Sequence, residues 1–184
     1  MSDYILRMEH FIDAHCHYDP IAFAKYHGEC RFVCNAVCED DWGRLISVAS
    51  TDVRIHPAIG IHPWYIKRLA PGWPDRMCRI LRENPNLMIG EVGMDNTRPN
   101  INNQADIFSV QYKIASDLGR SVHIHCVHSW DRLHNVLKSV PPPPAIVIHR
   151  YSASQELIPV LRRAVDDRIY FSFRDVVGDR MRKL

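Results

Sequence analysis

Short runs of apolar and β-branched residues alternate along the chain with longer stretches in which apolar residues recur at helical spacing. The short runs predict strands at residues 10–17, 31–37, 54–62, 87–94, 121–127, 145–151 and 168–173. The longer stretches predict helices at residues 39–49, 74–83, 104–118, 130–139 and 154–165. Strands that alternate with helices across short loops are typical of βα units around a parallel sheet, so we expect an α/β fold.

The composition is typical of a soluble globular protein. Among 184 residues, 46% are hydrophobic and 24% are charged, which favours a single domain over residues 1–184. The net charge of +2 argues against the broad basic face of a dedicated duplex-DNA binder. The sequence contains neither an apolar run long enough to span a membrane nor the pattern of a secretory signal. We therefore expect a cytoplasmic protein with no membrane partner, whose six cysteines are reduced thiols or metal ligands.

Residue types that bind metals occur at the ends of the predicted strands. The first strand contains Asp13, His15 and His17, which strand alternation places on one face, so both imidazoles can reach one ion. Later strands carry further ligand-type residues, namely His62, Glu91, His125 and His149. Because a parallel barrel gathers these strand ends at one rim, we expect imidazoles around one carboxylate, which can bridge two cations. Two such ions can activate water and neutralise a phosphate ester in the same step.

The order of these motifs resembles that of the TatD-type metal-dependent deoxyribonucleases, which are amidohydrolase-like TIM barrels. IDAHCH resembles the family's Asp-x-His-x-His motif, AIGIHP its Gly-x-His-Pro segment, and IGEVGMDNTR its Gly-Glu-x-Gly-Leu-Asp-x-x-Arg signature. The helix at residues 104–118, followed by SVHIHC, is similar to its Gln-rich helix and next strand, and VIHRYS to its His-x-Phe-Ser segment. The resemblance covers residues 11–173 and implies a short TIM-like (β/α) metallohydrolase barrel.

The resemblance also implies roles for individual residues. Its metal ligands would be His15 and His17 for one divalent ion and His125 and His149 for a second, with Glu91 as the bridging catalytic carboxylate. His62 and Arg98 would face the phosphate, and a metal-activated water would attack a phosphodiester at the 3′ end of a DNA strand. Imidazole ligands suit zinc, iron, nickel or manganese, and the resemblance adds magnesium.

Further residues near this rim are candidates for substrate contact. Trp64 follows His62 and Pro63 directly, and an exposed tryptophan can stack on a base. His128 follows the strand that carries His125, which makes it a second candidate. His123 lies one layer deeper in the predicted barrel, where we expect a hydrogen-bonded core histidine.

The family's eighth strand ends in an aspartate that binds metal and accepts a proton, and this sequence contains no such motif before Leu184. We therefore expect an eighth strand that is missing or atypical. Asp175, just after the seventh predicted strand, is a candidate stand-in for this acid, and a loop or helix-capping role is its alternative.

Two other functions remain open at this point. A barrel that keeps its metal cluster but lacks the family's last acid could serve as an interaction module, with an open sheet edge for self-association. Alternatively, similar sites hydrolyse small esters, amides or lactones instead of phosphodiesters.

Overall fold

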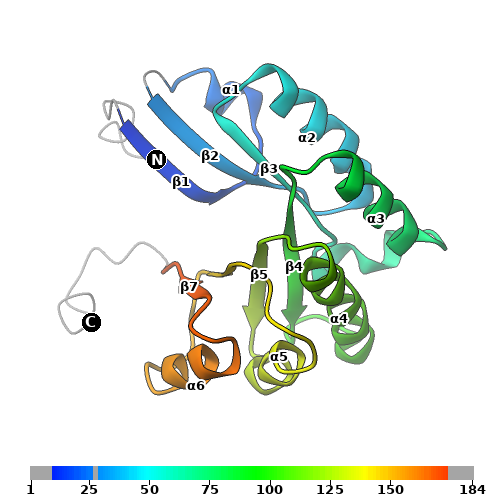
Figure 1. Cartoon of the computed structure of the whole chain (residues 1–184), viewed down its shortest axis with the longest axis vertical. Helices are drawn as coiled ribbons and strands as arrows, with labels where there is room; N and C mark the ends of the chain where they lie inside the picture. The colour runs from blue at the N-terminus through cyan, green and yellow to red at the C-terminus, as the bar shows by residue number, and fades with distance from the viewer. Residues whose placement is uncertain (1–9, 27–28, 174–184) are drawn as a thin grey trace.

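Seven parallel strands form one sheet in a computed structural model that describes residues 10–26 and 29–173. The strands lie in sequence order, β1-β2-β3-β4-β5-β6-β7, and the sheet curls into part of a barrel with the helices on its outer side (Figure 1). Their bounds are β1 His10–Cys16, β2 Glu29–Asn35, β3 Ile55–Ile59, β4 Met88–Asp95, β5 Val122–Val127, β6 Ile146–His149 and β7 Ile169–Phe171. The predicted α/β, TIM-like fold is confirmed.

Each of the five predicted helices is present, with ends shifted by up to three residues. Their bounds are α2 Glu39–Thr51, α3 Trp73–Glu83, α4 Ile101–Asp117, α5 Trp130–Leu137 and α6 Leu157–Ala164. Two short helices were not predicted, α1 (Pro20–Phe23) and the 3-10 helix η2 (Pro63–Arg68). Both begin with a proline after a residue whose side chain caps the helix, Asp19 in α1 and His62 in η2. The capping residue followed by proline is a helix-start signal that is visible in the sequence.

The predicted strand at residues 54–62 was too long, since β3 ends at Ile59. Just beyond this point, the backbone of residues 60 and 61 bonds to side chains. The Gly60 carbonyl accepts the Trp42 indole N–H at 3.0 Å, and Ile61 bonds to the side-chain amide of Gln111. The predicted strand at residues 145–151 was also too long: β6 ends at His149, and Arg150 adopts a φ of 50°.

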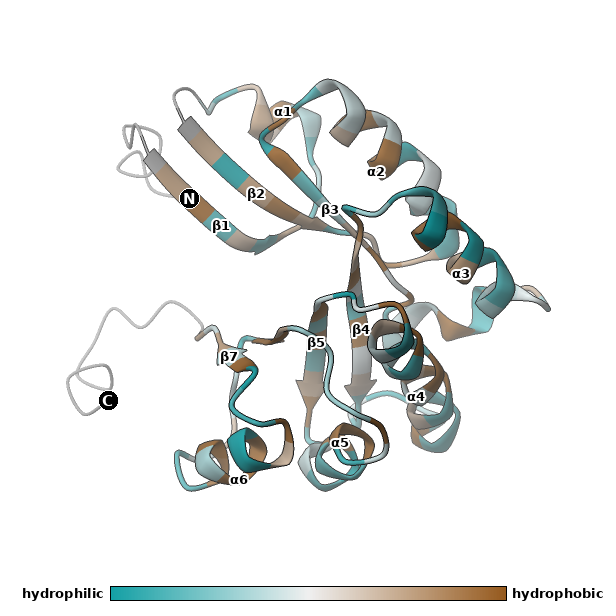
Figure 2. Ribbon diagram, viewed as in Figure 1, coloured by the Kyte–Doolittle hydropathy of each residue, from teal (hydrophilic) through white to brown (hydrophobic). Residues whose placement is uncertain are grey.

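The hydrophobic core lies between the sheet and its outer helices. The helices contribute fully buried side chains, including Trp42, Met77, Phe108, Leu133 and Leu161, and the strands contribute Ile59, Ile89, Ile124 and Ile148. Burying one large aliphatic side chain contributes about 1.5–3 kcal/mol. The helices carry both brown and teal residues in Figure 2, as expected for helices with one buried and one solvated face.

Two glutamines of α4 bind the backbone where β3 and β4 end. Gln111 accepts the Ile61 N–H at 2.8 Å and donates to the Ile61 carbonyl at 3.2 Å. Gln104 accepts the Asp95 N–H at 2.8 Å and donates to the Pro99 carbonyl at 2.9 Å. Both side chains are buried, so they satisfy backbone groups that the strand ladder leaves unpaired. The two glutamines therefore hold in place the backbone that follows β3 and β4.

β1 and β7 each pair with one neighbour within residues 10–26 and 29–173. Ile12 on β1 is 69% exposed and Tyr170 on β7 is 61% exposed. The predicted catalytic residue Asp175 lies outside the described residues. In the part of the chain that the structure describes, no helix combines the length and apolar character that a membrane span requires.

Gly93 in β4 occupies a position where a side chain would not fit. Its φ is +137°, and a Cβ at this position would overlap the backbone carbonyl of His125 on β5. Gly93→Ala should therefore lower the free energy of unfolding by about 2 kcal/mol or more, as measured by urea denaturation. The matched control is Gly43→Ala in α2, where an added Cβ meets nothing within 4 Å, and it should raise stability by about 0.5–1 kcal/mol. Equal unfolding midpoints for the two variants would contradict this account.

Candidate metal centre

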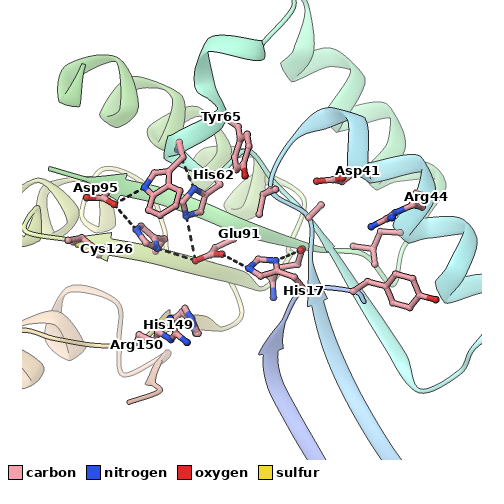
Figure 3. Close-up of a pocket in the computed structure, with 18 residues that line it drawn as sticks. His17, Asp41, Arg44, His62, Tyr65, Glu91, Asp95, Cys126, His149 and Arg150 are labelled. Carbon is pink, nitrogen blue, oxygen red and sulfur yellow. Dashed lines mark hydrogen bonds and ion pairs between the residues drawn. The ribbon is translucent and has the colours of Figure 1, made fainter. Parts of the chain in front are cut away.

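The predicted metal ligands converge at the carboxyl ends of the strands. Glu91 lies in β4, and imidazoles from β1, β5 and β6 surround its carboxylate, as does an imidazole at the start of η2 (Figure 3). These imidazoles belong to His15, His17, His62, His125 and His149. Residues separated by up to 134 positions in the chain thus meet around one carboxylate, because the curled sheet brings its strand ends together.

The two oxygens of Glu91 face different histidines. Oε2 lies 3.3 Å from Nε2 of His15 and 3.4 Å from Nε2 of His17. Oε1 lies 3.2 Å from Nδ1 of His125 and 3.9 Å from Nε2 of His62. A carboxylate with one oxygen directed to each of two imidazole sets has the arrangement that bridging between two cations requires.

Glu91 is held as an anion in a buried position. The residue is 3% exposed, and burial alone would raise the pKa of its carboxyl group. Hydrogen bonds from His125, His15 and His17 outweigh this effect and hold the pKa well below its usual value. The carboxylate is therefore ionised at neutral pH and exerts a strong attraction for cations.

His149 and His15 form a close pair beside Glu91. Their rings stack with centroids 3.6 Å apart, and ligand atoms of His15, Glu91 and His149 lie within 4.8 Å of one another. Burial, together with His15, lowers the pKa of His149 to about 3, so its imidazole is neutral at pH 7. His149 Nδ1 and His15 Nε2 are buried and lack a hydrogen bond of good geometry within the described residues. A neutral imidazole with an unused nitrogen, such as that of His149, is a suitable ligand for a divalent metal ion.

The structure groups these histidines differently from the expected pairs. The resemblance implied one pair from β1 and a second from His125 and His149. In the structure, His149 lies against His15, whereas His125 lies against His62 with ring centroids 4.5 Å apart. Ligand atoms of His62, Glu91 and His125 form a second group within 4.8 Å of one another. His62, which we expected to contact substrate, is therefore also a candidate ligand.

Asn35, at the end of β2, orients both histidines of the β1 segment. Its backbone carbonyl lies 2.8 Å from Nδ1 of His17, and its side-chain nitrogen lies 3.3 Å from Nδ1 of His15. The hydrogen bond with Glu91 raises the pKa of His17, although burial opposes this effect. Sequence reasoning missed Asn35. A polar residue between the apolar positions 32–34 and 36–37 was the available signal.

Asp95, the last residue of β4, supports the opposite side of the cluster. Its Oδ2 accepts the Trp64 indole N–H at 2.7 Å and lies 3.4 Å from Nε2 of His125. Burial raises the pKa of Asp95, but hydrogen bonds from Thr97 and Trp64 outweigh this and lower it to about 2. Asp95 belongs to the segment IGEVGMDNTR, but no role was predicted for it from the sequence. It acts here as a fixed acceptor that orients Trp64 and His125.

His123 lies one layer below the cluster, with its ring centroid 5.8 Å from that of His15. It is 3% exposed, and burial lowers its pKa to about 4. The expected buried position is confirmed. The expected hydrogen bonding is only partly found, since Nδ1 has no partner among the described residues.

A cavity of about 540 Å³ opens over this cluster. Trp64, a predicted substrate contact, lines it and is 50% exposed. Arg98 instead stacks on Trp64, with its guanidinium carbon 4.2 Å from the ring centroid, and lines a neighbouring depression. His128 is exposed and does not line the cavity. Two basic residues that sequence reasoning missed, Arg44 and Arg150, do line it.

The sequence of residues 12–183 matches the profile of a protein family described as TatD related DNase. Over 158 residues, the chain is 25% identical to the "Uncharacterized metal-dependent hydrolase YjjV" of Escherichia coli. This alignment covers 78% of the chain and 61% of that relative. Over 102 residues, it is 31% identical to the "3'-5' ssDNA/RNA exonuclease TatD" of Erwinia billingiae, which covers 53% of the chain and 38% of that relative. The chain thus spans less than two thirds of the length of these relatives.

Solved structures share the fold. The crystal structure of YjjV, a TatD homolog from Escherichia coli, aligns with a TM-score of 0.77 and 21% identity, over 88% of this chain and 66% of that chain. An uncharacterized amidohydrolase from Saccharomyces cerevisiae aligns with a TM-score of 0.58 and 15% identity, over 78% of this chain and 56% of that chain. At these identities, the likeness concerns the fold alone.

The Glu91 geometry generates a prediction about metal affinity. Glu91→Gln removes the negative charge but keeps the shape, and should weaken Zn²⁺ binding by about tenfold or more. The measurement is a competition titration against a chromophoric zinc chelator. Glu83→Gln is the matched control, because the Glu83 side chain is 58% exposed on α3 and should leave the affinity unchanged. Equal affinities for both variants would show that Glu91 is not a ligand.

Proposed function

This chain belongs to the family of TatD-related DNases, and from this premise we propose that it is a metal-dependent phosphodiesterase that removes nucleotides from the 3′ end of single-stranded DNA. The single observation that carries the proposal is the buried Glu91 carboxylate, whose two oxygens face two separate sets of imidazoles. The 3′ polarity is supported by the relatives that are named 3′–5′ exonucleases.

The residues that would hold metal ions divide around Glu91. His15, His17 and His149 would hold one ion on the Oε2 side, and His125 and His62 would hold a second on the Oε1 side. When bound, divalent ions supply Lewis acidity and lower the pKa of coordinated water. Zinc, manganese and magnesium are the candidate ions, since the ligands are imidazole nitrogens and one carboxylate.

His62 and Trp64 would position the substrate within the cavity. Burial lowers the pKa of His62 to about 4, so the imidazole is neutral at pH 7. Its Nδ1 accepts the Trp64 backbone N–H at 3.2 Å, which leaves the proton on Nε2, the nitrogen nearest Glu91. In a state without a metal ion at this nitrogen, Nε2–H can donate to a phosphate oxygen. The half-exposed Trp64 indole, held by Asp95, offers a face on which a terminal base can stack.

Ion stoichiometry tests the arrangement around Glu91. Native mass spectrometry in Zn²⁺ should show two ions on the wild-type chain. His15→Ala and His125→Ala should each lose one ion, because each substitution removes a ligand from a different side of the carboxylate. His134→Ala, on α5 and away from the cavity lining, is the control and should keep both ions. A single ion on the wild-type chain would contradict the two-ion arrangement.

The activity itself is tested on single-stranded DNA labelled at its 5′ end. Digestion should give a ladder that shortens from the 3′ end, chelation should abolish it, and added Mn²⁺ should restore it, because the cluster supplies water activation only with metal bound. Glu91→Gln should be inactive. A substrate whose 3′ end is blocked by an inverted nucleotide should resist digestion. Cleavage that persists in chelator, or internal cuts in the blocked substrate, would refute the proposal.

A further inference from the structure

Arg44 lies on the wall of the cavity and has no ion-pair partner among the described residues. It lies in α2 and lines the same cavity as His17 and His62 (Figure 3). Its guanidinium carbon is 5.8 Å from the centroid of the Tyr18 ring, and the guanidinium makes no ion pair or hydrogen bond with any described residue. Since a guanidinium has five N–H donors in a planar fork, Arg44 presents unused donors to whatever enters the cavity.

Tyr18 gives this arginine a fixed support. It follows His17 directly in sequence, and its ring packs against Phe23 of α1 with centroids 5.1 Å apart. The next residue, Asp19, caps α1 by accepting the backbone N–H groups of Ile21 and Ala22 at 2.9 and 3.3 Å. The residue after the candidate ligand His17 therefore has a side chain that packs against α1. Tyr18 and Arg44 both line the cavity beside the cluster.

The nearby acid does not neutralise Arg44. Asp41 also lines the cavity and lies three residues earlier on α2. Its Oδ2 accepts the Cys38 thiol at 3.3 Å, and it forms no ion pair with Arg44 in the described structure. The positive charge of Arg44 is thus available to a ligand, although α2 begins with three acidic residues, Glu39, Asp40 and Asp41.

We propose that Tyr18 and Arg44 form a nucleotide subsite, which binds the phosphate of the nucleotide next to the one that is cleaved in a single-stranded substrate. This inference rests on the proposed function. A planar donor fork matches the geometry of a phosphate, and an aromatic–arginine pair is suited to a single strand, whose bases are free to stack. In Figure 3, Arg44 lies on the same side of Glu91 as His17, and all three line one cavity.

If this subsite exists, the enzyme should prefer oligonucleotides to substrates that contain a single phosphodiester. A substrate with one phosphodiester reaches the metal cluster but has no second phosphate for Arg44, whereas an oligonucleotide contacts both. Arg44 therefore acts on substrate binding, and its contribution appears in KM more than in kcat.

Equilibrium binding tests the subsite without turnover. The probe is 5′-fluorescein-labelled dT8, titrated with metal-free protein in chelator and followed by fluorescence anisotropy. Arg44→Ala should raise the Kd about tenfold, the loss expected for a charge-assisted hydrogen bond. It should also reduce the slope of log K against log salt by about 0.7, the value for one phosphate contact on a single strand. Arg44→Lys, which keeps the charge but not the fork, should keep the slope and bind with intermediate affinity.

The matched control is Arg163→Ala, which removes an exposed arginine of α6 that does not line the cavity and should leave Kd and slope unchanged. Tyr18→Phe should bind as the wild type does, whereas Tyr18→Leu should weaken binding because it removes the supporting ring. An unchanged Kd in Arg44→Ala, equal losses in Arg44→Ala and Arg163→Ala, or no binding of dT8 by the wild type would each overturn the subsite.

A kinetic comparison separates this inference from the proposed function. The ratio of kcat/KM for dT8 to kcat/KM for bis(p-nitrophenyl) phosphate should fall at least about fivefold in Arg44→Ala, through a higher KM for dT8. A proportionate loss on both substrates would overturn the subsite, since it would place Arg44 at the reacting centre. If the metal-loaded wild type cleaves neither substrate, the proposed function fails, and the anisotropy titration still decides the subsite.

Discussion

The buried carboxylate of Glu91 sets the requirements for the rest of this site. An ionised carboxylate cannot remain 3% exposed without donors or cations that offset its lost hydration. The surrounding imidazoles meet this need, but only where β1, β4, β5 and β6 curl enough to bring their ends together. A divalent cation would meet the same need, and the imidazoles would then serve as neutral ligands. The fold and the metal chemistry therefore depend on one electrostatic constraint.

Buried side-chain amides allow the backbone to leave the sheet where the site needs it. Gln111 and Gln104 bond to the backbone just after β3 and at the end of β4, and Asn35 contacts the β1 histidines from the end of β2. The two glutamine amides satisfy backbone groups that the strand ladder leaves unpaired, whereas the Asn35 amide contacts the His15 ring. Residues of α4 and β2 thus help to position the segments that bear the candidate ligands.

Recognition of the proposed anionic substrate would depend on local charge. The net charge of +2 argues against a broad basic face, but Arg44 and Arg150 both line the cavity, and Figure 3 shows them on different sides of Glu91. Arg98 is held over Trp64 and extends the basic surface outside the cavity. Such a distribution suits a single strand that contacts the protein at a few phosphates better than it suits a duplex, whose binding needs a wider positive surface.

The sequence by itself determined the parallel α/β fold and the strands that carry candidate ligands, because hydrophobic periodicity and the rim rule for parallel barrels depend on local pattern. It did not determine where β3 ends, since that depends on Gln111 from a helix about fifty residues away. Nor did it determine that His149 stacks on His15, that Arg98 lies over Trp64, or that Arg44 reaches the cavity. Sheet curvature and side-chain packing decided these contacts. The contacts join residues far apart in the chain, so local sequence spacing does not reveal them.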